Sequence, residues 1–329
     1  MNLDRQLPNS VDINIAPSTD VQEFQLQGGT GAPGVQNGET FVLPVYSQRI
    51  TPSFGPVTDL VSNANASYHG LTLEARRGMG ALQSGYAGAE RGLEFRLAWT
   101  WSKAIDFGQS AAAVPRTNGQ FDPFTARYDK GLSALDFPHR VVATALWSPR
   151  LSSSLARFGE SGRLLRAAAN GWSMAWIFYE SSGRGYSYQI FGGKRLPGGH
   201  ESINGSGGSA TLPTVGRNTL RLPDSANLDM RLSRSFRLRE GLHLRASAEA
   251  FNLTNRLNYS GITQRAFLVG TPAPLNGVTN GPEVTPLVFQ DAATVATEGL
   301  NVLPFGAYTA AGTSQTHERQ IQLGLRIEF

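Results

Sequence analysis

The C-terminal end of the chain carries a regular alternation of apolar and polar side chains. Apolar residues stand at every second position, namely Ile321, Leu323, Leu325, Ile327 and Phe329. A period of two over this length places one set of side chains on each face of an extended strand. The pattern therefore predicts a β-strand with one apolar and one polar face.

The same alternation recurs along the chain and predicts an all-β protein. It is clearest at residues 93–102, 226–238 and 242–252, and it is weaker elsewhere. We predict eight long strands in an antiparallel sheet, at residues 3–15, 68–78, 93–102, 139–148, 171–181, 226–238, 242–252 and 319–329.

One pair of predicted strands has the spacing of a hairpin. Residues 239–241 join the two strands, and the last residue of this loop is Gly241. Such a loop suits a type I turn followed by a residue in the left-handed region. Pairing position 238 with position 242 places Arg231 opposite Glu249, which is a favourable cross-strand charge pair.

The connections between the predicted strands are alternately long and short. Residues 16–67, 103–138, 182–225 and 253–318 form the long ones, and residues 79–92, 149–170 and 239–241 the short ones. Outer-membrane barrels have long extracellular loops and short periplasmic turns, whereas the loops of a soluble β-sandwich do not alternate in length. The pattern favours a transmembrane barrel segment. Whether residues 16–67 and 253–318 hold further short strands stays open.

Aromatic residues fit the same reading. All five tryptophans lie in predicted strands: Trp99, Trp101, Trp147, Trp172 and Trp176. Aromatic girdles flank the apolar band of outer-membrane barrels, so we predict that these residues mark the membrane–water interfaces. A transported solute would first meet aromatic residues of the long loops, such as Tyr186, Tyr188, Phe191 and Tyr308.

The composition narrows the class of protein further. Of 329 residues only 16% are charged, below the roughly 25% of soluble domains, and 37 are glycine. The net charge is +4 and the basic residues are scattered, so we expect no nucleic-acid partner. No apolar run reaches the ~18–20 residues of a membrane helix. The first six residues lack the apolar segment of a signal peptide, and we expect none in this chain.

No constellation of catalytic or metal-binding residues is visible. There is no cysteine, and the five histidines, at positions 69, 139, 200, 243 and 317, are isolated from one another. The Gly192-Gly193-Lys194 segment lacks the spacing and the hydroxyl of a phosphate-binding loop. We therefore expect no enzyme activity, no metal and no cofactor.

Charged residues on the polar faces of the strands are the candidate functional side chains within the sheet. They are Glu94, Arg96, Asp229, Arg231, Arg245 and Glu249. In a barrel they would point into the lumen, where they could contact a plug domain. Alternatively, they solvate one another in a wet interior.

Seven short motifs resemble segments of TonB-dependent outer-membrane receptors, especially the Oar-like group with a carboxypeptidase-regulatory-like domain. The longest is EAFNLTNRLNY at residues 249–259. The others are SYHGL at 67–71, LAWTWSKAID at 97–106, DFPHR at 136–140, GW at 171–172, GRNTL at 216–220 and NLDMRLSRSF at 227–236. They occur in the order of the family and cover most of the chain.

The resemblance implies that residues 1–329 are the C-terminal part of a receptor barrel. Such receptors have a plug domain inside a barrel of roughly 22 strands. No plug domain is expected in this chain, and TonB would act only through one. The implied partners are outer-membrane lipid, the barrel-assembly machinery, which would read the strand ending in Phe329, and an unidentified solute.

These observations predict an incomplete antiparallel β-barrel in the outer membrane. Eight strands taken from a larger barrel leave two open edges, so we expect a curved open sheet or a closure with poor pairing between strands 3–15 and 319–329. On this reading the chain does not transport alone. The alternative is a self-contained eight-stranded barrel with surface-binding or adhesive loops, because eight strands can close.

Overall fold

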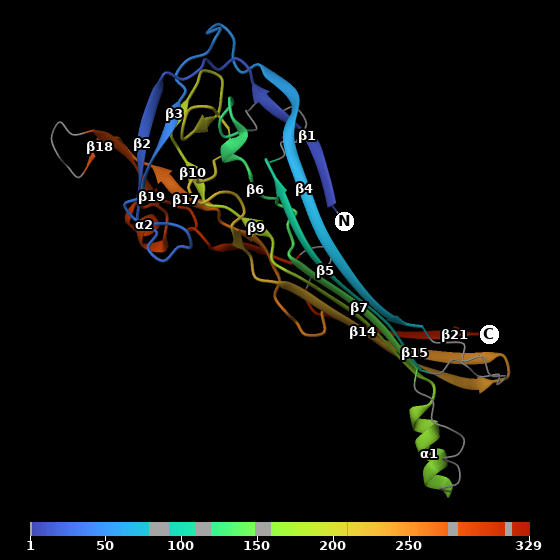
Figure 1. Ribbon diagram of the computed structural model, residues 1–329. Helices are drawn as coiled ribbons and strands as arrows, with labels where there is room; N and C mark the ends of the chain where they lie inside the picture. Colours follow the sequence, from blue (N-terminus) through green and yellow to red (C-terminus); the bar gives the residue numbers. More distant parts are fainter. Residues whose placement is uncertain are drawn as a thin grey trace.

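A long-stranded sheet with a group of shorter elements at one end makes up the molecule (Figure 1). The computed structural model describes residues 2–78, 92–108, 120–148, 159–208, 210–275, 282–312 and 318–329. In these ranges the helices are α1 (Gly159–Ala169), α2 (Ala292–Thr297) and the 3-10 helix η1 (Ala126–Tyr128). The predicted all-β class is confirmed.

The long sheet contains all eight predicted strands in chain order. They are β1 (Asn2–Asp12), β4 (Thr58–Arg77), β5 (Gly92–Asp106), β7 (His139–Ser148), β8 (Trp172–Ser181), β14 (Ser225–Arg239), β15 (Leu242–Phe251) and β21 (Gln320–Glu328). Every neighbouring pair is antiparallel, and the short β6 (Gly131–Leu132) pairs with β5. The main difference is β4, which begins at Thr58 rather than at residue 68.

The sheet is open at both sides. β1 pairs only with β4 and β21 pairs only with β15, so these two strands form the edges of the sheet as far as it is described. The predicted lack of pairing between the first and last strands is confirmed.

The hairpin of β14 and β15 keeps the predicted register from Arg231, which lies opposite Glu249, to Arg237. The predicted pairing of position 238 with position 242 across a three-residue loop is wrong, because a register shift after Arg237 pairs Arg239 with Leu242 and leaves a loop of residues 240–241. Gly241 in this loop has the expected positive φ, 73°.

The connections lie at opposite ends of the sheet according to their length. The turn between β14 and β15 and helix α1, which lies between β7 and β8, are both at the end remote from the shorter elements (Figure 1). Residues 79–91 and 149–158 of the other predicted short connections lie outside the described residues.

The four long connections fold together into a cap, by which we mean the described residues between β1 and β4, β5 and β7, β8 and β14, and β15 and β21. Its largest sheet has the order β10 (Gln189–Phe191), β17 (Arg265–Val269), β19 (Glu283–Phe289), β2 (Asp20–Gln27) and β3 (Thr40–Val45), with β18 (Ala273–Pro274) beside β19. Three small sheets pair β9 (Gly185–Tyr186) with β13 (Leu220–Arg221), β11 (Lys194–Arg195) with β12 (Glu201–Ser202), and β16 (Tyr259–Ile262) with β20 (Tyr308–Ala311). Residues 16–67 and 253–318 therefore do hold further strands.

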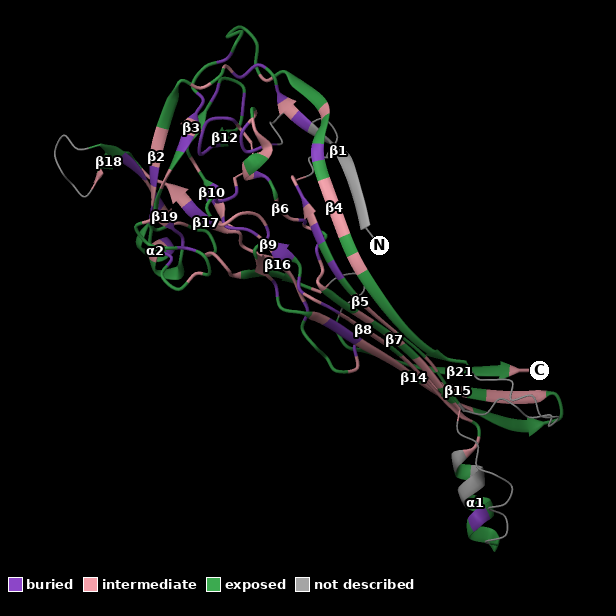
Figure 2. Ribbon diagram, viewed as in Figure 1, coloured by how far each residue is buried: buried purple, intermediate pink, exposed green. Residues whose placement is uncertain are grey.

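The main cluster of buried apolar residues lies in the cap and draws on all four connections. Phe24, Phe121, Tyr188 and Phe267 come from the first to the fourth connection in turn, and each is at most 1% exposed. In Figure 2 the buried segments gather in the cap, while the long strands are mostly intermediate or exposed. The cap is thus a folded unit rather than a set of independent loops.

Two glycines allow backbones of the cap to approach closely. A Cβ atom on Gly208 would lie 1.7 Å from the Gln120 carbonyl oxygen, and one on Gly183 would lie 1.7 Å from the Leu222 carbonyl oxygen. Because neither backbone could tolerate this contact, any side chain at these positions would force the segments apart.

The cap covers the polar face of the sheet at the end of β5. Ser102, Ala104 and Asp106 lie on this face and are 8%, 9% and 7% exposed. Trp101 belongs to the opposite face and is 39% exposed. One end of the polar face is therefore enclosed by the chain itself, and the apolar face is not.

Candidate functional site

The predicted charged residues of the polar face form cross-strand ion pairs. Arg231 Nε donates to Glu249 Oε1 over 2.6 Å. Arg96 Nε lies 2.9 Å from Glu74 Oε1 on the neighbouring strand β4. Both arginines are more than half exposed, so each pair contributes at most about 1 kcal/mol to stability.

The remaining predicted charges lie on the same face with different surroundings. Arg245 Nη1 lies 3.3 Å from Glu328 Oε1 on β21. Asp229 accepts hydrogen bonds from Asn227 Nδ2 and from the backbone N–H of Asn252. Glu94 is exposed. Among these six predicted charges, all of which are described, only Arg231 and Glu249 pair with each other, and Asp229 anchors the end of β15.

The five tryptophans lie on the apolar face of the sheet, but at different positions along the strands. Trp101 pairs with His139 at the cap end of the sheet, and Trp147 pairs with Leu93 at the remote end. The eight residue steps from Leu93 to Trp101 span about 26 Å along the strand.

Three tryptophans remain. Trp99 pairs with Val141, two residues below Trp101, and Trp176 pairs with Ala145 and with Met230 in mid-sheet. Trp172 is at the remote end, where its Nε1 donates to the Ala168 carbonyl of α1. Trp99, Trp101, Trp147 and Trp172 thus lie toward one or other end of the sheet, and Trp176 does not.

The terminal strand has the most exposed apolar face of the sheet. The exposed fractions are 67% for Ile321, 82% for Leu323, 77% for Leu325 and 60% for Ile327, and Phe329 is fully exposed.

One ion pair fastens the cap to the end of β5, and a second joins two of the connections next to it. Arg217 Nη2 donates to Asp106 Oδ1 at the end of β5 over 2.6 Å, and its Nη1 donates to the Asp129 carbonyl over 2.7 Å. Arg221 pairs with Asp136, which also accepts from the backbone N–H of Ala104. Three of the motifs quoted above therefore meet here, because they supply Asp106, Asp136 and Arg217.

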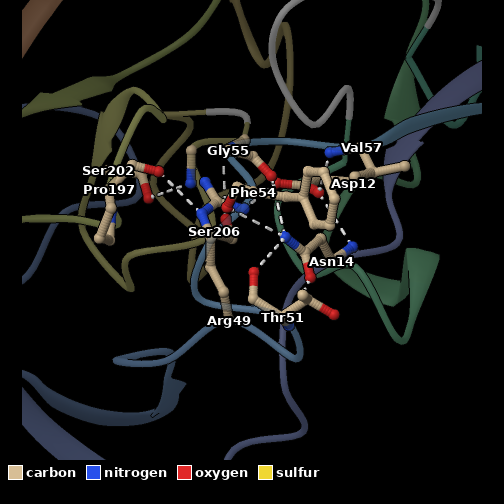
Figure 3. A network of polar contacts seen from close by, with 12 residues as sticks. Asp12, Asn14, Arg49, Thr51, Phe54, Gly55, Val57, Pro197, Ser202 and Ser206 are labelled. Atoms are coloured by element: carbon tan, nitrogen blue, oxygen red, sulfur yellow. Dashed lines mark hydrogen bonds and ion pairs between the residues drawn. The ribbon is translucent and has the colours of Figure 1, made fainter.

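A buried network fastens the end of β1 to the cap (Figure 3). Asp12 Oδ2 accepts from Arg49 Nη1 over 2.9 Å, and both side chains are under 5% exposed. Arg49 Nε also donates to the Pro197 carbonyl of the third connection. Asn14 Nδ2 donates to the carbonyls of Thr51, Phe54 and Gly55, which closes the loop around it.

A cavity of about 660 Å³ lies where the cap meets the sheet. Its walls come from the end of β5 and from the second, third and fourth connections, and they include the Arg217–Asp106 pair. This volume falls within the range of about 300–1,000 Å³ that is usual for small-molecule sites. Most of its lining side chains are hydroxyl, amide or charged groups.

One carboxyl group of the cavity wall has a strongly shifted pKa. Burial raises the pKa of Asp129 to about 7, although the carboxylate accepts the backbone N–H of Phe121. Near neutral pH, Asp129 is therefore partly protonated.

The four aromatic residues predicted in the long loops have different surroundings in the structure. Tyr186 lines the cavity, with its ring centroid 6.1 Å from that of Phe305. Tyr188 is fully buried in the cap core. Phe191 lies under the Arg265 guanidinium, and Tyr308 is stacked on Tyr259.

A family model gives the first external comparison. The outer membrane beta barrel domain matches residues 2–322. The chain belongs to this family. The match covers all eight long strands of the barrel domain up to Gln322 in β21. A search of curated proteins found no match, and neither did a search of solved structures.

The described part of the barrel domain holds neither a metal-binding cluster nor a membrane-spanning helix. No group of three or more histidine, aspartate or glutamate side chains there could hold a metal ion. His317 lies outside the described residues. Neither described α-helix combines the length and the hydropathy needed to cross a bilayer.

The residues that join the cap of this barrel domain to its sheet were not predicted from the sequence. Asp106, Asp136 and Arg217 were visible only as letters of family motifs, and Asp12 and Arg49 carried no signal. One available signal was a charged residue shortly after a predicted strand, since Asp106 follows the strand predicted at residues 93–102 by four residues. Its partner could not be identified, because Arg217 lies in a different connection.

Proposed function

We propose that this chain forms the C-terminal part of the barrel of a TonB-dependent outer-membrane receptor, which takes up a solute. The open sheet carries the proposal, since its edge strands β1 and β21 have no partner on their outer sides among the described residues. An unpaired backbone group in the bilayer core costs several kcal/mol. Further strands that pair with β1 and β21 would remove this cost, so we infer that the complete barrel contains them.

The face and loop arrangement supports the same proposal. The apolar face would contact lipid, the polar face would line the lumen, and the cap would lie outside the cell, as the long loops of outer-membrane barrels do. Trp101 at one end of the sheet and Trp147 and Trp172 at the other would lie near the two interfaces. The strand ending in Phe329 would be the signal read by the barrel-assembly machinery.

The proposal also states what this chain does not do alone. TonB acts on a plug, and no plug is assigned to residues 1–329. The Arg217–Asp106 and Arg221–Asp136 pairs instead give these residues a role in holding the cap against the end of the barrel. We therefore expect the chain to supply the wall and the outer cap of the receptor, but not energised uptake by itself.

An antibody against the cap would test the proposal in outer membranes of the source bacterium. We expect it to detect a polypeptide or a complex that also contains a plug and further strands, and we expect solute uptake through it to stop when TonB is deleted. A heat-modifiable species of 35.4 kDa without companions would contradict the proposal and favour the self-contained eight-stranded barrel.

A further inference from the structure

The cavity between cap and sheet presents polar groups without a partner in the described part of the chain. The side chains of Tyr186, Gln189, Ser260 and Thr309 line it, and no side-chain hydrogen bond is made by them within the described ranges. Gln264 Oε1 accepts from the backbone N–H of Ser187 over 3.1 Å, which leaves its Nε2 available. These hydroxyl and amide groups can donate and accept, which suits a ligand with many hydroxyl groups.

The charged side chains of the cavity wall are two arginines and two aspartates, and one of each forms an ion pair. Arg217 is neutralised by Asp106 at 2.6 Å. Arg184 is exposed, lines the same cavity and has no ion pair within the described residues. The carboxylate of Asp129 accepts the backbone N–H of Phe121 through both oxygens. The guanidinium of Arg184 is thus the group left for an anionic ligand, because its planar fork matches a carboxylate.

We propose that this cavity binds an acidic, polyhydroxylated solute of the class of uronic-acid saccharides. Arg184 takes the carboxylate, and the amides of Gln189 and Gln264 and the hydroxyls of Tyr186, Ser260 and Thr309 bind the sugar hydroxyls. The inference extends the proposed function by naming the class of solute, and it rests on that function only for the direction of transport.

The lining distinguishes this class from two simpler ones. A small inorganic anion would use Arg184 but leave most of the neutral polar groups unused. A hydrophobic ligand would leave the same groups without hydrogen bonds, at a cost of about 1–3 kcal/mol for each buried group. The volume of about 660 Å³ also exceeds what a single inorganic ion fills.

Calorimetric titration of the full chain in detergent micelles would test the proposal, with the integrity of the cap verified by its resistance to protease. The probes are galacturonic-acid di- and trisaccharides, their uncharged methyl esters and sulfate. We expect the acidic saccharides to bind at least tenfold more tightly than the esters or sulfate. Failure of all acidic saccharides to bind, or equal binding of sulfate, would overturn the proposal.

Variants then assign the contacts. We expect Arg184→Gln to weaken the acidic saccharides roughly tenfold and the esters hardly at all, because only a charge-assisted bond is lost. Arg184→Lys should restore much of the affinity, and Tyr186→Phe should weaken both probes by a few fold. Lys194→Gln is the matched control, since it removes an exposed cation of the cap outside the cavity.

An unchanged affinity in Arg184→Gln would overturn the assignment. Binding is measured here without TonB, a plug or transport. If the saccharides do not bind, the receptor proposal is unaffected. If they bind and the protein is a small self-contained barrel, the binding proposal still holds.

Discussion

Strands of the long sheet and strands of the cap place apolar side chains in opposite environments. On β21, Leu323 and Leu325 are 82% and 77% exposed, whereas on β17 and β19 Phe267 and Leu287 are fully buried. The cap completes its own core in water from four separate connections. The apolar face of the long sheet is covered by no part of the described chain, and lipid is the covering expected for an outer membrane beta barrel domain.

The difference shows that the cap and the long sheet are stabilised by different interactions. The cap is held by side-chain packing and buried ion pairs, so single substitutions there should be costly. The sheet is held by its backbone ladder and by lipid, so the same substitutions should matter less unless they alter the lipid-facing surface.

The largest effect should come from breaking the buried ion pair of the cap. We expect Arg49→Met to destabilise the cap by about 3–5 kcal/mol, because Asp12 is left charged and buried. Arg96→Met in the sheet, whose partner is Glu74, should cost at most about 1 kcal/mol, because that pair is exposed. Hydrogen exchange followed by mass spectrometry would report both, and equal losses of protection would refute the comparison.

Truncating an aromatic residue of the cap core should have a similar or slightly smaller effect. Phe267→Ala removes a fully buried ring that contacts Tyr188 and Phe289, at a cost of about 3–5 kcal/mol. Leu325→Ala leaves no cavity, since the side chain is 77% exposed. We therefore expect protease to cleave the cap faster in Phe267→Ala only. Faster cleavage in both variants would indicate one shared core.

These contrasts also explain which parts of the fold the sequence could predict. The long strands were predictable because lipid on one face and water on the other impose a period of two over nine or more residues, as from Ile321 to Phe329. The cap was not, because its strands are as short as two residues and its core combines Phe24, Phe121, Tyr188 and Phe267 from distant segments. The cavity shares this origin, since its walls form only when three connections meet.

The cap should also respond to pH, by an amount on the order of a few kcal/mol. The pKa of Asp129 is about 7 in the folded chain, above the value near 4 of an unfolded aspartate, so the folded state binds the proton more tightly. The stabilisation from this group is fully present below about pH 4 and is lost as the pH rises through about 7. Chemical unfolding of the cap at pH 4.5, 6 and 8 would measure this slope. Asp129→Asn should remove it, and a slope that persists in this variant would assign it to another group.

The smallest destabilisation is expected from a charge on the lipid-facing surface of the sheet, and it should affect only folding into lipid. Leu325→Arg places a charge on that face, which costs about 2–4 kcal/mol at the bilayer midplane and less near an interface. Gln322→Arg adds the same charge on the polar face, where Glu249 lies directly opposite, and should cost little. The effect of Leu325→Arg should appear on folding into lipid vesicles and leave the protease resistance of the cap unchanged. Equal folding of the two variants into vesicles would mean that lipid does not cover the apolar face, and the comparison between sheet and cap would then lose its physical basis.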